Sequence, residues 1–126
     1  MKSNEIGKFI YNKLITNTDL FNLVGDKIFP LIAENGTEYP YVIYSRSGGG
    51  NTTYTKDGLT LENCTITIDC VHPDYGKGVE VAIAVREVLD NLCEIPVMFQ
   101  LTSTTESWDD EGIFIQTLNY DIDIRV

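Results

Sequence analysis

The chain has 126 residues, a length that suits one domain with a hydrophobic core of its own. Its 43% hydrophobic and 22% charged residues are typical of a soluble globular protein, and no apolar run approaches the roughly 18 residues needed to span a bilayer. The net charge is −10, and residues 87–126 carry nine acids against Arg125 alone, which argues against binding to nucleic acid or anionic membranes.

The first part of the chain predicts two helices and two extended segments. The first helix has Ser3 as its N-cap and carries apolar residues at helical spacing, namely Ile6, Phe9, Ile10 and Leu14. Residues 18–25 predict a short helix that a glycine closes. Residues 27–32 are expected to be extended at a sheet edge or in coil, because Pro30 cannot donate to a ladder. A strand is expected over 39–44.

The second part predicts strands and one long helix. Residues 61–71 alternate between apolar and polar side chains and form the clearest strand. A turn follows, and then a helix over 78–93 with a narrow polar stripe of Glu80, Ala84, Glu87 and Asn91. The chain closes with strands at about 97–107 and 113–125, joined by an acidic hairpin.

This order predicts one α+β domain over residues 1–126. We expect a mainly antiparallel sheet of about four to five strands, with the N-terminal helix and the long helix packed on one face. The long helix is apolar around most of its circumference, and Val81, Val85 and Val88 fall on a line beside the one that would face a sheet. A sheet covers only one side of a helix, so these valines need the first helix or another subunit as cover.

The glycine triplet Gly48, Gly49 and Gly50 raises the question of a phosphate-binding loop. A P-loop requires the spacing GxxxxGK[ST] followed by a helix, and here Asn, Thr and Tyr54 lead into a strand. We therefore predict that residues 44–58 form a flexible arm between strands, with no affinity for nucleotides. The triplet and Tyr54 are candidates for contact with another subunit.

Neither the acidic residues nor the cysteines predict a catalytic or metal-binding site. Asp109, Asp110 and Glu111 lack the spacing of a calcium loop, so a solvated hairpin is expected, and replacing all three by lysine is expected to leave folding intact. Asp121 and Asp123 share one strand face about 7 Å apart, and they face solvent or a partner subunit.

Cys64 and Cys70 lie about 20 Å apart along a strand and cannot form a bridge. His72 is the only histidine and Cys93 is the third cysteine, so no zinc framework is present. We expect no catalytic site, no metal and no cofactor.

Three segments resemble a known family. They are DLFNLVGDKIFP at 19–30, YPYVIY at 39–44, and the long helix from about Gly78 with a strand ending in Asp69-Cys70-Val71 before it. Taken in this order, they resemble the small tail-completion, or tail-terminator, proteins of long-tailed bacteriophages and prophages. The glycine arm and the acidic hairpin lie outside the recognised pattern.

The resemblance implies a non-enzymatic α+β subunit of the virion that is made in the host cytoplasm. Such a subunit forms a hexameric ring on the tail tube, stops tube polymerisation and docks on head–tail connector proteins. In such a ring Asp109, Asp110 and Glu111 would either line the channel and repel DNA or lie on an outer solvated loop. Two alternatives remain: a head-closure or other neck connector component, and a small domain that binds a metabolite between sheet and helix.

Overall fold

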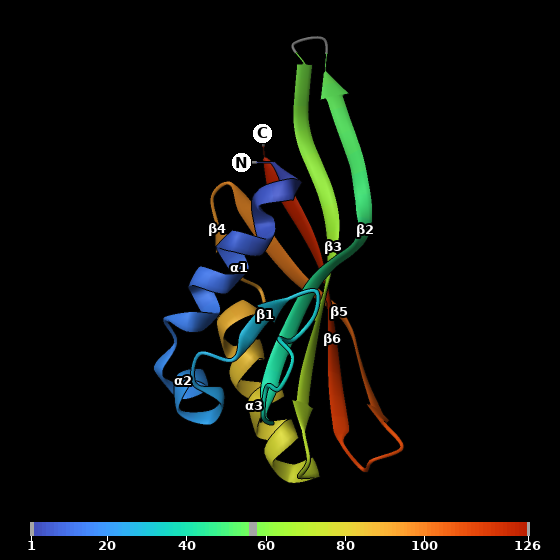
Figure 1. Ribbon diagram of the computed structural model, residues 1–126. Coiled ribbons are helices and arrows are strands. Elements are labelled where there is room, and N and C mark those ends of the chain that lie inside the picture. The colour runs from blue at the N-terminus through green and yellow to red at the C-terminus, as the bar shows by residue number, and fades with distance from the viewer. Residues whose placement is uncertain (1, 56–57, 126) are drawn as a thin grey trace.

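The computed structural model describes residues 2–55 and 58–125, and within these it leaves out the side chains of residues 49–55 and 58–60. Three α-helices lie on one side of a six-stranded sheet, so the predicted α+β class is confirmed (Figure 1). The elements, in chain order, are η1 (Ser3–Glu5), α1 (Ile6–Ile15), α2 (Thr18–Val24), β1 (Ile28–Pro30), β2 (Tyr41–Thr55), β3 (Gly58–His72), α3 (Tyr75–Leu89), β4 (Cys93–Glu94), β5 (Val97–Trp108) and β6 (Phe114–Arg125).

The strand order in the sheet is β1-β2-β3-β6-β5-β4. The pairing of β1 with β2 is parallel, and all the other pairings are antiparallel. The two short strands β1 and β4 lie at the outer edges. Strand β1 corresponds to the extended segment predicted at 27–32, and β4 raises the strand count above the predicted four to five. The long hairpin of β2 and β3 projects beyond the body at the end where both termini lie, and the hairpin of β5 and β6 lies at the other end (Figure 1).

The core lies between the sheet and the helices. The alternation predicted for β3 is confirmed, since Cys64, Ile66, Ile68 and Cys70 are all buried. On the helical side α1 contributes Ile6, Ile10 and Leu14. Aromatic side chains fill the centre, where Phe99 packs against Phe9 and Tyr120 with ring centroids 6.0 Å apart in both pairs. Burial of this apolar surface provides most of the favourable free energy of folding.

The long helix differs from its prediction at both ends and in its exposed stripe. It begins at Tyr75 because the Asp74 carboxylate accepts a hydrogen bond from the Lys77 N–H at 3.0 Å and caps the first turn. It ends at Leu89, four residues before the predicted end, because the chain turns into β4. Within the stripe, Ala84 is buried and Ile83 is exposed instead, so the solvent-facing line contains a large apolar side chain.

Ser3 does not cap the first helix as predicted. It is the first residue of η1, it is buried, and its N–H donates to the Glu62 carboxylate of β3 at 3.0 Å. Its hydroxyl accepts a hydrogen bond from the Arg46 guanidinium of β2 at 3.2 Å. These contacts attach the N-terminal segment to the sheet at the base of the β2–β3 hairpin.

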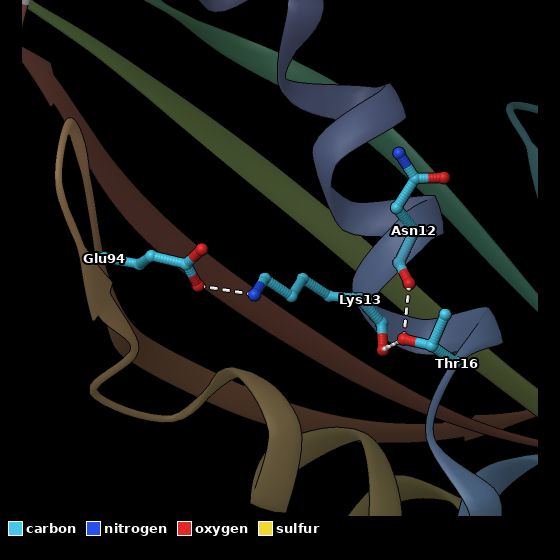
Figure 2. A network of polar contacts seen from close by, with 4 residues as sticks. All are labelled: Asn12, Lys13, Thr16 and Glu94. Atoms are coloured by element: carbon cyan, nitrogen blue, oxygen red, sulfur yellow. Dashed lines mark hydrogen bonds and ion pairs between the residues drawn. The ribbon is translucent and has the colours of Figure 1, made fainter.

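Polar contacts also connect α1 with the opposite edge of the sheet. Figure 2 shows the Lys13 side chain reaching from α1 to the Glu94 carboxylate of β4, with which it forms an ion pair. The Thr16 hydroxyl donates to the Asn12 carbonyl at 2.7 Å and ends the helix (Figure 2). Both partners of the ion pair are partly exposed, so the pair contributes less than about 1 kcal/mol to stability.

All three cysteines are free thiols, as predicted. Cys64 and Cys70 are buried on the core face of β3, and Cys93 is exposed on β4. Across residues 2–55 and 58–125, none of the helices has the length and apolar character that crossing a membrane requires.

Candidate assembly interface

The β2–β3 hairpin forms an arm with a glycine-rich base. The described register of β3 against β6 ends at Leu61, which pairs with Arg125, and beyond this point β2 and β3 pair with each other among the residues that the structure describes (Figure 1). The register of β2 against β3 shifts on either side of the glycine triplet at 48–50. The triplet lies inside a strand that returns as a second strand, so the helix N-terminus that a P-loop uses to bind phosphate does not follow it.

The exposure of the predicted contact residues of the arm is known for one of them. Gly48 is exposed, and a Cβ added there would meet no neighbouring atom. Gly49, Gly50 and Tyr54 belong to β2, but the Tyr54 side chain and the exposure of all three lie outside the described part of the structure. The role of the arm in assembly therefore stays a prediction.

The three valines of the long helix lie inside the protomer. Val81 and Val85 are buried, and Val88 is half-buried and packs against the core. Helix α3 contacts β3 and β6 of the sheet and also α1 and α2, so the helix is covered on more than one side within the protomer. They belong to the hydrophobic core, and the side of α3 open to a partner contains Ile83 instead.

The acidic hairpin turn contains one structural carboxylate and two free ones. Oδ1 of Asp109 accepts hydrogen bonds from the N–H groups of Glu111 at 2.9 Å and Ile113 at 3.0 Å. Gly112 completes the turn with a φ of 78°, a backbone conformation that glycine adopts at low cost. The side chains of Asp110 and Glu111 are exposed. The triple lysine substitution would therefore damage the turn at Asp109, in contrast to the sequence-based expectation.

The sheet face that the helices leave open is polar. Asp121 and Asp123 lie on this face, as predicted, and the Asn63 amide donates to both carboxylates at 2.8 and 2.9 Å. A second group of side chains links neighbouring strands, since the Thr67 hydroxyl bonds to Asn119 at 2.9 Å and the Asn119 amide donates to Ser103 at 3.0 Å. Side chains that satisfy one another in this way suit a face in contact with water.

Large apolar side chains are exposed at both outer edges of the sheet. Leu31 and Ile32 follow directly after β1 and are 73% and 75% exposed. At the opposite edge Ile95, in the turn between β4 and β5, is 83% exposed, and Trp108 at the end of β5 is 74% exposed. These are the four most exposed large hydrophobic residues among those described, and exposed apolar groups of this kind mark contact surfaces.

Among the described residues, the centre of the fold leaves no space for a small ligand. The same residues contain no group of three or more His, Cys, Asp and Glu side chains arranged to hold a metal ion. His72 acts as a turn residue, because its Nδ1 accepts the Asp74 N–H at 2.9 Å, and burial lowers its pKa. The space between sheet and helices is filled by fully buried side chains, including Tyr120, Phe99 and Leu89, which argues against a metabolite site there.

Residues 8–123 match the family described as Tail completion protein gp17. The chain belongs to this family. It is therefore a structural component of a phage tail, and the family is not a class of enzymes. A chain of a solved structure described as "Virion of native gene transfer agent (GTA) particle" shares the fold, with a TM-score of 0.74 over 93% of this chain and 92% of that one. The two sequences are 14% identical. None of the curated proteins compared with the chain matches it.

Sequence reasoning missed the edge residues and the structural role of Asp109. The exposure of Leu31 and Ile32 depends on where β1 ends, which hydropathy does not indicate. Asp109 was detectable in principle, because an aspartate three residues before a glycine is typical of a turn closed by the carboxylate.

Proposed function

We propose that the protein assembles as a ring, of six copies as the family resemblance implies, at the end of the tail tube. There it stops polymerisation of the tube and connects the tail to the head. The observation that supports this best is the placement of the exposed apolar residues at two opposite edges of one sheet. The partners of the protein are further copies of itself, the tail-tube protein and the head–tail connector proteins. It meets them in the host cytoplasm during assembly.

The position of these edges favours a ring over a symmetric dimer. A dimer with twofold symmetry brings the same patch of both copies together, whereas a ring joins two different patches of each copy head to tail. Leu31 and Ile32 lie at one edge, and Ile95 and Trp108 lie at the two ends of the opposite edge. Each copy thus presents two separate contact surfaces, as a closed head-to-tail ring requires.

The channel of such a ring has to let DNA pass without binding it. Asp110 and Glu111 are exposed at the tip of the β5–β6 hairpin and are candidates for its wall, together with Asp121 and Asp123 of the open sheet face. Negative charge repels phosphate. An outer, solvated position of the hairpin is the alternative for Asp110 and Glu111. Asp109 is a third candidate, and its carboxylate also accepts two backbone hydrogen bonds within the turn.

Negative-stain microscopy and light scattering on the purified protein, alone and with tail tubes, test the ring. We expect rings, on the tubes if not in isolation, and stronger assembly as salt rises from low values, because salt screens repulsion between the copies. Ile32→Asp should weaken assembly, whereas Asn12→Asp, which adds the same charge on the exposed side of α1, should not. A strict monomer at high concentration and in the presence of tubes would overturn the proposal.

A head-closure or other neck connector component remains the alternative within the same particle. Both candidates would form rings, so a pull-down against purified tail-tube protein and connector protein separates them. Binding to the tube protein supports the tail-end position, and binding to the connector alone supports the alternative.

A further inference from the structure

We propose that neighbouring copies in the ring join by β-sheet pairing, with the outer edge of β2 in one copy hydrogen-bonded to the outer edge of β5 in the next. The proposal rests on the ring proposed above and specifies its contact. Both strands are long and lie next to the short edge strands of the sheet, and each has free backbone groups over much of its length. Each edge thus pairs with a strand of a neighbouring copy of the same chain.

The outer edge of β5 is free over most of its length. Strand β4 pairs only with Val97 and Met98, and the Phe99 N–H donates outward to the Leu92 carbonyl at 2.7 Å. Backbone N–H groups alternate in direction along a strand, and the extra residue between Leu101 and Ser103 shifts that alternation by one. The N–H groups of Thr104 and Glu106 therefore point outward, away from β6.

The outer edge of β2 is free beyond β1. The Tyr44 carbonyl faces outward and accepts the Leu31 N–H at 2.9 Å, which ends the contact with β1. From Ser45 to Thr55, none of the strands described pairs with the outer side of β2. The outer edge of β1 is less suitable for pairing, because Pro30 has no N–H and the Ile28 N–H already donates to Asp26.

The direction and height of the two edges allow them to meet in a ring. Three antiparallel pairings separate β2 from β5, so the two strands run in opposite directions, and copies with the same orientation meet as an antiparallel pair. The registers across the sheet place Gln100 level with Gly48 and Thr104 level with Tyr44. At equal height residues 45–48 face residues 100–103. A slide of five residues along the strands, about 17 Å, brings all of residues 100–108, including Thr104 and Trp108, against the free part of β2, and we call this full contact between β2 and β5 the seam.

Both edges have few of the residues that prevent an edge strand from pairing with another chain. Natural edge strands are protected by lysine, proline, bulges or short length. Both strands contain bulges, but the free part of β5 has eight uncharged residues and Glu106, and no proline. Its residues 102–108 are all exposed. The free part of β2 contains one charge, Arg46, of the opposite sign. In a chain of net charge −10, contact between copies through these two edges avoids most of the repulsion between acids.

Proline substitution at Thr104 tests the seam in the full-length protein. Thr104→Pro removes an outward N–H and no donor of the protomer's own ladder, so the fold should persist at this edge position. Thr104→Val is the matched control, because it keeps the N–H and the branched side chain. Under the conditions in which the unmodified protein forms rings, we expect Thr104→Pro to weaken self-association by about tenfold or more, and Thr104→Val to assemble normally.

The results of this experiment distinguish a failure of the proposed β2–β5 contact from a failure of the ring proposal. If Thr104→Pro keeps its circular dichroism spectrum and assembles like the control, the seam is refuted while the ring proposal stands. If the unmodified protein does not self-associate under any condition, with or without tail tubes, both proposals fail.

A second measurement applies if Thr104→Pro does not fold. Trp108 is the only tryptophan of the chain and ends β5 with its side chain largely exposed. In the unmodified protein its emission should shift to shorter wavelength, and its quenching by acrylamide should fall, as rings form. An unchanged Trp108 signal in assembled rings would refute the seam.

Discussion

Removing the Asp109 carboxylate should destabilise the protein, although the residue lies in an acidic surface turn. One oxygen of this side chain accepts two backbone N–H groups, those of Glu111 and Ile113. The Asp109 N–H in turn donates to the Ile113 carbonyl at 3.0 Å, so the carboxylate and the backbone close the same turn. Ile113 is buried, and the turn therefore holds a buried apolar residue directly before β6.

The size of the effect follows from these two hydrogen bonds. A side-chain oxygen that caps backbone N–H groups contributes about 0.5–2 kcal/mol, and bonds to a charged acceptor lie towards the upper end of this range. Asp109→Ala should thus lower the free energy of unfolding by about 1–2 kcal/mol. For a domain of about this length, each kcal/mol changes the melting temperature by about 3–6 °C. Asp109→Asn keeps an acceptor oxygen in place and should lose less than half as much.

Thermal and urea unfolding followed by circular dichroism measure these differences. The control is the double variant Asp110→Lys, Glu111→Lys, since neither side chain has a partner role in the turn, and its stability should stay within about 0.5 kcal/mol of the unmodified protein. If Asp109→Ala is as stable as the unmodified protein, or if the double variant loses as much as Asp109→Ala, the assignment of the turn to Asp109 is wrong.

Three further outcomes follow from the buried and hydrogen-bonded groups. Tyr120→Phe should cost about 1–2 kcal/mol in urea unfolding, because the buried hydroxyl donates to the Asp90 carboxylate at 2.6 Å; an unchanged midpoint would show that this bond adds nothing. A thiol reagent should label Cys93 alone in the native protein and all three thiols after denaturation, since burial of the other two raises their pKa; rapid labelling of three would contradict the fold. The hydrogen bond from Ser3 lowers the pKa of Glu62 below its ordinary value of 4.5, so the stability that Glu62 adds is present at neutral pH and lost as the pH falls below that value. The difference between the unmodified protein and Glu62→Gln should then disappear at low pH, and a pH-independent difference would exclude this linkage.

The strands of the sheet interior could be predicted from the sequence because their periodicity is strong. Alternating apolar residues identified β3 and β6, and each is covered on one face by helices and paired on both sides. The edge strand β4 and the full length of β2 could not be predicted in the same way. Strand β4 has two residues, and β2 continues through three glycines that hydropathy assigns to a loop. Here the long-range pairing with β3 determines the structure, and it overrides local propensity.

The candidate interface was less predictable than the fold. Apolar spacing places Val81 and Val85 on α3, but it does not say which neighbour covers them. In the structure both are buried, and α3 contacts the sheet as well as α1 and α2. Conversely, Leu31 and Ile32 resemble core residues in the sequence. They are exposed because β1 stops at Pro30 and the chain leaves the sheet, with Leu31 at a φ of 65°. Exposure of this kind is a property of the tertiary structure, so it cannot be read from a window of residues.

The distribution of charge connects the proposed seam with the proposed channel. If six copies of net charge −10 form one ring, the total of about −60 (six times −10) must lie away from the contacts between copies, because unscreened acids facing each other oppose assembly. Salt at physiological strength screens charges beyond about 8 Å, so only acids near a contact matter. The acids Asp121 and Asp123 lie on the open face of the sheet, whereas the free part of each proposed edge contains a single charge, Arg46 on β2 and Glu106 on β5. A ring joined through these edges keeps the acidic faces in water, where they can repel DNA without repelling the neighbouring subunit.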